Sequence, residues 1–320
     1  MQKERYKLQT LILERNDCLR KEARRELYFE YIAKAITTLP LPEFETIEVQ
    51  QAEELETEYL LTIADVHYGA EFTSENNEYS RTIAQERFQY LLYDAVKFIK
   101  KHKLSKIHVV SLGDLVQGML RMKDLQLNKS SVVSSVVEIS HIIANFLNQL
   151  SKYVTVHYYH TPAANHTQLR FLQAKANELP LEDLEYIIGH YIQDVCAANS
   201  RIIVHLADEG KQYIDIPIEG NVICAMHGHQ IKNLETSLKD LSMLKRDFID
   251  YLILGHTHAN KLIPGQSTGA CNDAEILVSS SFVGSDPYSD SLFKNSKAAA
   301  NIYGFNFVYG LTETYKIILN

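Results

Sequence analysis

Apolar residues near the start of the chain recur at helical spacing and predict a helix ahead of any strand. The stripe consists of Leu8, Leu11, Ile12, Leu19, Ala23, Leu27, Ile32 and Ala33. The pattern over residues 4–37 fits one long helix or two short ones. Two prolines within residues 39–44 (LPLPEF) then end any helix, because proline lacks an amide hydrogen and forces its predecessor into extended geometry. We therefore expect an N-terminal helical extension and linker over residues 1–55, followed by a separate domain over residues 56–320.

From residue 59 onward, short apolar runs alternate with longer helical patterns, which is typical of strands joined by covering helices. The pattern predicts strands at residues 59–64, 106–112, 153–160, 221–226 and 251–254. It predicts helices at residues 81–102, 131–150, 182–197 and 234–248. Three further strands, at residues 275–283, 303–309 and 312–318, follow without intervening helices. We therefore expect an α/β (α+β) domain with a mixed sheet.

Composition changes this picture little, but it bears on what the chain can bind. With 46% hydrophobic and 22% charged residues, the chain is that of an ordinary folded protein. Its net charge of −8 lacks the basic balance that marks many nucleic-acid binders, although a local basic patch is compatible with it. Residues 1–35 carry nine Lys or Arg against six acids, whereas residues 41–60 carry seven Glu and no base. The charge pattern therefore changes near the predicted boundary.

The sequence also bears on the compartment. No stretch approaches the roughly 20 apolar residues of a membrane span, and the start MQKERYKLQT lacks the apolar region of a secretory signal. The four cysteines are scattered without a CxxC pair, which predicts neither a disulfide framework nor a zinc knuckle. They are Cys18, Cys196, Cys224 and Cys271. We expect a cytoplasmic protein with reduced thiols and no membrane association.

Each of the five predicted strands before residue 255 runs into a small polar cluster. The clusters are Asp65-Val66-His67, Gly113-Asp114, Asn165-His166, His227-Gly228-His229 and Gly255-His256-Thr257-His258. In α/β sheets, ligand and catalytic groups gather in the loops beyond the carboxyl ends of the strands. We therefore expect these distant residues to form one shared site.

The residue types at this site indicate divalent metal ions. Carboxylate, carboxamide and imidazole form a mixed oxygen and nitrogen shell that suits Mn, Fe, Zn and similar ions. The candidate ligands are Asp65, His67, Asp114, Asn165, His227, His256 and His258. They exceed what a single tetrahedral ion uses, so two ions are implied. Asp114 stands alone after its strand and is the natural bridging carboxylate. The pairs Asp65/His67 and His256/His258 are each expected to aim at one point from extended chain.

Two such ions supply the chemistry of phosphate-ester hydrolysis. A pair roughly 3.5 to 4 Å apart polarises a phosphoryl oxygen, steadies the leaving group and makes a bridging hydroxide near neutral pH. His166, next to Asn165, is then suited to donate a proton or to stabilise charge on the phosphate. It is the candidate catalytic residue, and no serine or cysteine nucleophile is required.

Taken in order, the motifs DVH, GD, NH, H and GHTH resemble the calcineurin-like metallophosphoesterase signature over residues 60–260. The resemblance implies a two-sheet β-sandwich flanked by helices, in agreement with the mixed strands predicted above. It implies one ion held by Asp65, His67, Asp114 and His258, and a second held by Asp114, Asn165, His227 and His256. It also implies His166 as the catalytic histidine, and it favours His227 over His229 as the ligand in their motif.

Two departures from the family pattern bear on function. The family's asparagine motif usually reads GNH followed by Asp or Glu, whereas this chain has Ala164 before and Thr167 after. The carboxylate that orients the histidine is therefore missing. The second motif, GDLVQG, lacks the arginine of phosphoprotein phosphatases, which argues against a Ser/Thr protein phosphatase. The sequence also shows no C-terminal cap domain of the size seen in SbcD-type repair nucleases.

Within the superfamily, LTIADVHYGAEF and VVSLGDLVQGML look most like the phage and prophage branch of SbcD-type DNA repair exonucleases. That resemblance implies a nuclease for DNA or RNA phosphodiester bonds, with manganese as the favoured ion and iron, zinc, nickel or magnesium as alternatives. It also implies a homodimer, to which the N-terminal helix can contribute. Two other functions stay open: a phosphodiesterase or phosphatase for small or cyclic nucleotides, and a catalytically decayed binding module, which Thr167 alone supports.

Three side chains near the motifs are candidates for substrate binding. Tyr68, next to His67, can stack on a base. Arg170 can grip a phosphate with two hydrogen bonds, or it can form a surface salt bridge. Arg121, together with Lys123, can line the same cleft.

The remaining histidines receive structural interpretations. Those on predicted strands, His108, His157 and His205, are expected to be satisfied core residues. Those on predicted helices, His102, His141 and His190, are expected to be solvated surface residues.

Overall fold

The chain divides into two compact units, Met1–Leu41 and Pro42–Asn320. The computed structural model describes residues 2–37, 57–119, 126–170, 174–175, 178–179, 181–208, 210–265, 274–291 and 295–320. The predicted domain boundary at residue 55 lies outside the described residues.

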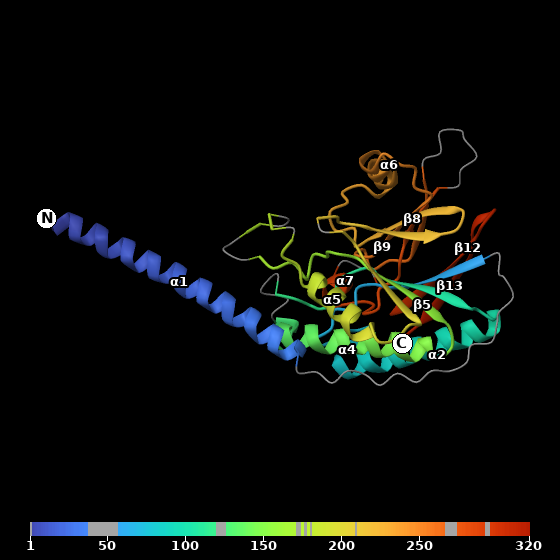
Figure 1. The fold of residues 1–320 in the computed structure, drawn as a ribbon, viewed down its shortest axis with the longest axis horizontal. Coiled ribbons are helices and arrows are strands. Elements are labelled where there is room, and N and C mark those ends of the chain that lie inside the picture. The colour runs from blue at the N-terminus through green and yellow to red at the C-terminus, as the bar shows by residue number, and fades with distance from the viewer. Residues whose placement is uncertain are drawn as a thin grey trace. The chain divides into compact units, whose positions relative to one another are not determined.

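In its described part, the N-terminal unit is one helix, α1 (Gln2–Thr37), drawn in blue in Figure 1. The structure therefore decides between one and two helices in favour of a single one. Large apolar side chains along it are exposed: Tyr6, Leu8, Leu11, Ile12, Leu13, Leu19, Leu27 and Tyr31. A helix whose apolar side chains are exposed gains little stability from packing, which is the main source of helix stability in proteins.

The larger unit is built around two β-sheets, each with parallel and antiparallel pairs. In spatial order the first sheet contains β13 (Gly310–Ile318), β12 (Ala299–Asn306), β1 (Thr57–Ile63), β4 (Lys106–Ser111), β5 (Thr155–His160) and β6 (Ile202–Leu206). The second contains β10 (Lys261–Pro264), β11 (Glu275–Val278), β9 (Tyr251–Leu254), β8 (Asn221–Met226) and β7 (Ile214–Ile218). Neighbours β1, β4, β5 and β6 run parallel, as do β8, β9 and β11. Their carboxyl ends therefore meet at one edge of each sheet.

The inward faces of the two sheets form the central core. Its buried members include Leu60, Val110, Tyr159 and Tyr303 from the first sheet and Ile216, Ile223, Ile253 and Leu277 from the second. Burial of apolar side chains between two stacked sheets is the dominant stabilising term of such a layer. The expected two-sheet β-sandwich flanked by helices, with an N-terminal helix, is confirmed.

Helices cover the outer faces of both sheets (Figure 1). They are α2 (Arg81–His102), α4 (Val132–Ser151) and α5 (Leu184–Cys196) on the first sheet and α6 (Leu234–Lys245) on the second, with a short α7 (Pro287–Ser291). Side chains of Ser80, Ser131, Asp183 and Asn233 accept a main-chain amide at the start of the four long helices. A two-stranded ribbon, β2 (Phe72–Thr73) and β3 (Glu78–Tyr79), precedes α2. None of the described helices combines the length and apolar character needed to cross a membrane.

Five of the described strands are missing from the sequence prediction: β2 and β3 of the short ribbon, and β6, β7 and β10 at the edges of the two large sheets. β10 has no buried residue, so its apolar pattern is weak. β6 (IIVHL) and β7 (IDIPI) do carry apolar patterns, which the sequence prediction left out. The last two predicted strands are shifted. The range predicted as 303–309 includes the turn at residues 307–309, which joins β12 to β13.

Candidate metal centre

The five polar clusters follow β1, β4, β5, β8 and β9, at the carboxyl ends of these strands. Main-chain hydrogen bonds join the loops to one another. The amide of Asp65 donates to the carbonyl of Gly113, and the amide of Gly255 donates to that of His227. The amide of His67 donates to the carbonyl of Asp114 over 2.9 Å. The parallel strands therefore deliver residues from distant parts of the sequence to a single place.

Three overlapping groups of side chains each hold ligand atoms within 4.8 Å of one another. They are Asp65/His67/His258, His67/Asp114/His166 and Asp114/His227/His256. Nε2 of His67 lies 3.3 Å from Nε2 of His258, and Oδ2 of Asp114 lies 3.1 Å from Nε2 of His227. The middle group shares His67 with the first and Asp114 with the third, so the three groups form one continuous cluster.

Asn165 completes the set of predicted ligands. Its Oδ1 lies 2.8 Å from Nε2 of His227. Nδ1 of His227 donates to the carbonyl of Leu112 over 2.8 Å, so Nε2 faces two oxygens, those of Asn165 and Asp114. Such an arrangement is satisfied by a proton or by a metal cation, and metal-binding histidines commonly donate their other ring nitrogen to a carbonyl in this way. All seven predicted ligands are thus brought together.

Five of the seven predicted ligands have left-handed backbone, which residues other than glycine rarely adopt. They are Asp65 (φ 54°), His67 (50°), Asp114 (50°), His256 (65°) and His258 (53°). In the described part of the chain, the other non-glycine residues with positive φ are Lys103 and Arg246, which cap helix ends. Strained backbone persists where the surroundings over-determine it, and it clusters at functional sites.

This backbone corrects the expectation about the two ligand pairs. They do not lie in extended chain, because both members of each pair have positive φ. Asp65 and His67 nevertheless share the first group. His256 and His258 do not aim at one point: His258 belongs to the first group and His256 to the third.

Burial and mutual contact set the charges of the cluster. Burial raises the pKa of Asp65. Burial also opposes ionisation of Asp114, but the imidazole of His227 holds the pKa of that carboxyl well below its usual range. Against the effect of burial, Asp114 raises the pKa of His227 to about 9. Burial lowers the pKa of His67 well below its usual value and that of His256 to about 3, so both offer neutral imidazoles.

The donor set fits a pair of divalent cations. Nδ1 of His67 is buried and has no hydrogen-bond partner among the described residues. Two ring nitrogens, those of His67 and His258, face each other, and Oδ1 of Asp65 lies 3.6 Å from the second of them. Neutral imidazole nitrogens and carboxylate oxygens are the ligands that first-row divalent metals take in proteins.

His166 belongs to the middle group. Its ring meets that of His67 edge to face, with centroids 4.7 Å apart. Its Nδ1 donates to the main-chain carbonyl of Gln117 over 2.9 Å. That carbonyl orients the imidazole in a chain that has Thr167 in place of the family's acid. Sequence reasoning missed Gln117, because a main-chain contact leaves no signal in residue type.

The three candidates for substrate binding fare differently. Tyr68 is a correction: its side chain has no exposed surface and its hydroxyl donates to Glu138 on α4 over 2.8 Å, so the ring cannot stack on a base. Arg170 donates to Oε1 of Gln168 over 3.3 Å, and Nε2 of Gln168 lies 3.3 Å from Nε2 of His229. Arg121, like Lys123, lies outside the described residues.

His229 lies near the third group without belonging to it. Its ring centroid is 5.5 Å from that of His227 and 6.4 Å from that of His256. The third group therefore contains His227 and not His229.

The strand histidines form a separate structural cluster. Nε2 of His108 lies 2.7 Å from Oε2 of Glu58, and Nδ1 of His157 lies 3.3 Å from Nε2 of His205. On α4, His141 is partly buried, and the hydroxyl of Tyr191 lies 2.7 Å from its Nε2, so the expectation of a solvated surface residue is wrong there.

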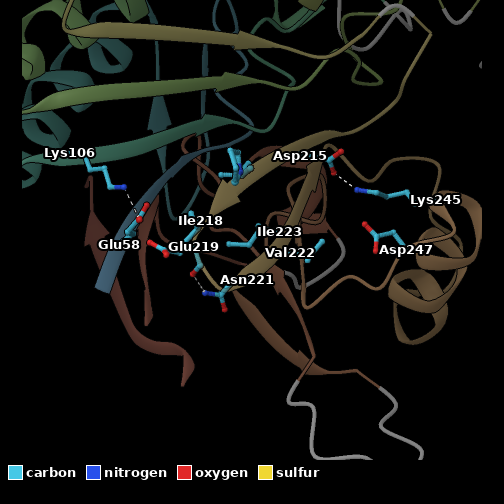
Figure 2. Close-up of a pocket in the computed structure, with 12 residues that line it drawn as sticks. Glu58, Lys106, Asp215, Ile218, Glu219, Asn221, Val222, Ile223, Lys245 and Asp247 are labelled. Atoms are coloured by element: carbon cyan, nitrogen blue, oxygen red, sulfur yellow. Dashed lines mark hydrogen bonds and ion pairs between the residues drawn. The ribbon is translucent and has the colours of Figure 1, made fainter. Parts of the chain in front are cut away.

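A cavity of about 600 Å³ lies away from this centre (Figure 2). Its lining includes residues at the amino ends of β1, β4 and β8, whereas the predicted ligands follow the carboxyl ends of the same strands. Four of its charged side chains form two ion pairs, Lys106 with Glu58 at 2.7 Å and Lys245 with Asp215. None of the predicted site residues lines it.

Comparison with known proteins shows the family to which the chain belongs. The SPbeta prophage-derived protein YonJ of Bacillus subtilis (strain 168) is 37% identical over 322 residues, which cover 99% of this chain and 78% of that protein. The chain belongs to the YonJ family. The YonJ coiled-coil domain matches residues 1–39, the segment that contains α1. In this member of the YonJ family, the chain contains both the N-terminal helix and a domain with the clustered candidate ligands.

Several solved structures are similar to this member of the YonJ family over most of their own length. An archaeal phosphodiesterase has 11% identity and a TM-score of 0.38, over 81% of this chain and 99% of that one. Vps29 from Entamoeba histolytica, complexed with zinc, has 16% identity and a TM-score of 0.35, over 82% and 99%. A predicted phosphoesterase from Streptococcus pneumoniae TIGR4 has 8% identity and a TM-score of 0.32, over 83% and 99%.

Proposed function

We propose that this chain is a two-metal phosphodiesterase that acts as a nuclease on DNA or RNA. The observation that carries the proposal is the set of three overlapping ligand groups, in which Asp114 is shared and His166 stands in the middle. A purely structural role for these histidines and carboxylates does not explain why five of them have strained backbone.

The sequence motifs imply which residues would hold each ion. Asp65, His67, Asp114 and His258 would hold one ion, and Asp114, Asn165, His227 and His256 the other. A pair of divalent ions, manganese being favoured, supplies Lewis-acid activation of the phosphoester and of water. His166, oriented through Nδ1 by the carbonyl of Gln117, offers its other ring nitrogen to protonate the leaving oxygen or to stabilise charge on the phosphate.

A nucleic-acid substrate is supported by the motif resemblance to phage and prophage nucleases and by the prophage origin of the B. subtilis relative. The net charge of −8 weakens binding to duplex DNA, so single strands and ends are the favoured form of substrate. Arg170 supplies a positive charge near His229, beside the third group.

A substrate panel tests this function. The chain is freed of metal, reloaded with manganese, and offered single-stranded DNA, duplex DNA, RNA and a set of linear and cyclic nucleotides. We expect cleavage of single-stranded oligonucleotides and two metal ions per chain by elemental analysis. If nucleotides are hydrolysed while oligonucleotides stay intact, the small-nucleotide alternative replaces the nuclease. Metal binding without hydrolysis of any substrate would favour the binding module.

We also propose that α1 joins two copies of the chain. Its exposed apolar stripe and its match to the YonJ coiled-coil domain support a helix that pairs with its own kind. Replacing Ile12 and Leu19 by Glu should convert dimer to monomer in light scattering. Glu at Lys3 and Thr10, on the opposite face, is the matched control and should leave the dimer intact. A monomeric wild-type chain would contradict the proposal.

A further inference from the structure

The start of α5 holds two carboxylates that no sequence motif singles out. Asp183 caps the helix and is 5% exposed, and Glu185 in the first turn is 0% exposed. Burying two acids side by side is unfavourable unless each gains specific partners. Burial and the neighbouring Glu185 raise the pKa of Asp183 to about 8, which reflects that crowding. The hydrogen-bond partners of the two carboxylates therefore indicate their role.

Glu185 holds the loop that follows β4. Its Oε1 accepts the main-chain amide of Leu115 over 3.0 Å, and its Oε2 lies 3.1 Å from Nε2 of His160. The peptide unit that ends in this amide begins at Asp114, whose carbonyl accepts the amide of His67 over 2.9 Å. Both polar atoms of the Asp114–Leu115 peptide are thus bound, one by Glu185 and one by a ligand loop.

These hydrogen bonds restrain the backbone at Asp114, which has an unfavourable conformation. Asp114 has a φ of 50°, a conformation that L-residues leave unless neighbouring groups hold them in it. The helix approaches closely enough to do so because Gly189 lacks a side chain: a Cβ there would lie 2.8 Å from the ring of His160.

Asp183 holds the loop that follows β5. Its Oδ1 accepts the amide of Glu185 as a helix cap, and its Oδ2 accepts the amide of Ala164 over 3.2 Å, next to Asn165. The hydroxyl of Thr167 donates to the carbonyl of Ala164 over 3.4 Å, and the carbonyl of Thr167 accepts the amide of Leu184 over 3.0 Å. Asp183 therefore connects the start of α5 to the main chain next to Asn165.

We infer that Asp183 and Glu185 are positioning residues that hold the loops after β4 and β5 in the geometry that the metal ligands require. Neither side chain belongs to the three ligand groups, so each acts through the main chain of residues next to ligands. The inference rests on the proposed two-metal site and adds to it the device that fixes two of its loops.

Manganese titration of the metal-free full-length chain by calorimetry tests the role of Glu185. Glu185→Ala removes the acceptor for Leu115 and should weaken manganese binding about 10- to 100-fold, the usual effect of losing a residue that supports a metal ligand. Glu185→Gln keeps an oxygen for that amide and should bind within a few-fold of wild type. Asp194→Ala, at an exposed position on the same helix, is the matched control.

Asp183→Ser provides the second variant, because serine is a good helix cap but is too short to reach Ala164 as well. It should keep the helix content measured by circular dichroism yet lose manganese affinity, even if Glu185→Ala fails to fold. Wild-type affinity in the Asp183→Ser variant, or in a folded Glu185→Ala variant, would overturn this inference alone. A wild-type chain that binds no divalent ion would overturn the proposed metal centre itself.

Discussion

The main-chain amide of His166 donates a hydrogen bond to Oδ1 of Asp114 over 2.8 Å. The other carboxylate oxygen, Oδ2, lies 3.1 Å from Nε2 of His227. One buried carboxylate therefore joins the candidate catalytic histidine, on the loop after β5, to a candidate ligand on the loop after β8. Substitution of His166 should therefore separate catalysis from metal binding, whereas substitution of Asp114 should affect both.

Replacing Asp114 by Asn should remove both ions together. A carboxamide has a single oxygen donor, so it cannot serve two cations, and affinity should fall by at least the 10- to 100-fold seen when supporting residues are lost. Elemental analysis of the purified variant measures the metal per chain, with Asp194→Asn as an exposed control. A variant that retains both ions would refute the shared role of Asp114.

Replacing His166 by Ala should abolish turnover and leave the metal content intact. The imidazole can protonate or stabilise the reacting phosphate, a contribution of about 10²- to 10⁴-fold in rate, and it is not among the seven ligands proposed for the two ions. Steady-state hydrolysis in manganese, together with elemental analysis, checks both halves of the prediction. An unchanged rate would remove this histidine from the mechanism.

Gly118→Ala should disturb the candidate metal centre because the added methyl group would collide with the loop that carries His166. Gly118 has a φ of 68°, and a Cβ there would lie 1.8 Å from the carbonyl oxygen of His166. Gly210→Ala is the matched control, because Gly210 also has positive φ (83°) but has nothing within 4 Å of the added Cβ. Both variants carry a backbone strain of about 1–2 kcal/mol.

The steric contact should therefore appear as a difference between the two variants. We expect only Gly118→Ala to lose metal affinity and activity, and to have the lower melting temperature. Equal behaviour of the pair would show that the close approach to His166 has no consequence.

Stability should depend on pH through the strand histidines, away from the metal centre. Burial, aided by the charge of His108, lowers the pKa of His157 from 6.5 to about 4. The unfolded chain then binds a proton at a higher pH than the folded chain does, so the free energy of unfolding decreases as pH falls from about 6.5 towards 4. Urea unfolding in chelator between pH 4 and 8 measures this slope. His157→Gln should make this slope less steep, although His229, whose pKa burial lowers to about 4, contributes in the same direction. An identical slope would contradict the assignment.

Much of the fold can be predicted from the sequence because it depends on the local pattern of apolar residues. The helix predicted at residues 81–102 is α2, and the strands at 221–226 and 251–254 are β8 and β9. These elements have buried faces with clear apolar periodicity. The edge strand β10 has no buried residue and therefore lacks the pattern that identifies a strand, whereas β6 and β7 carry apolar patterns that the prediction left out.

The sequence by itself determined which residues could gather as ligands, since Asp65, Asp114 and His227 each follow a buried strand and parallel strands end at a common edge. Only the tertiary structure decided how they gather. It separates His256 from His258, buries Tyr68 against α4, and brings Asp183 and Glu185 behind the loops. These outcomes depend on main-chain torsions and on contacts between segments far apart in the chain. Neither is encoded in the identity or spacing of neighbouring residues.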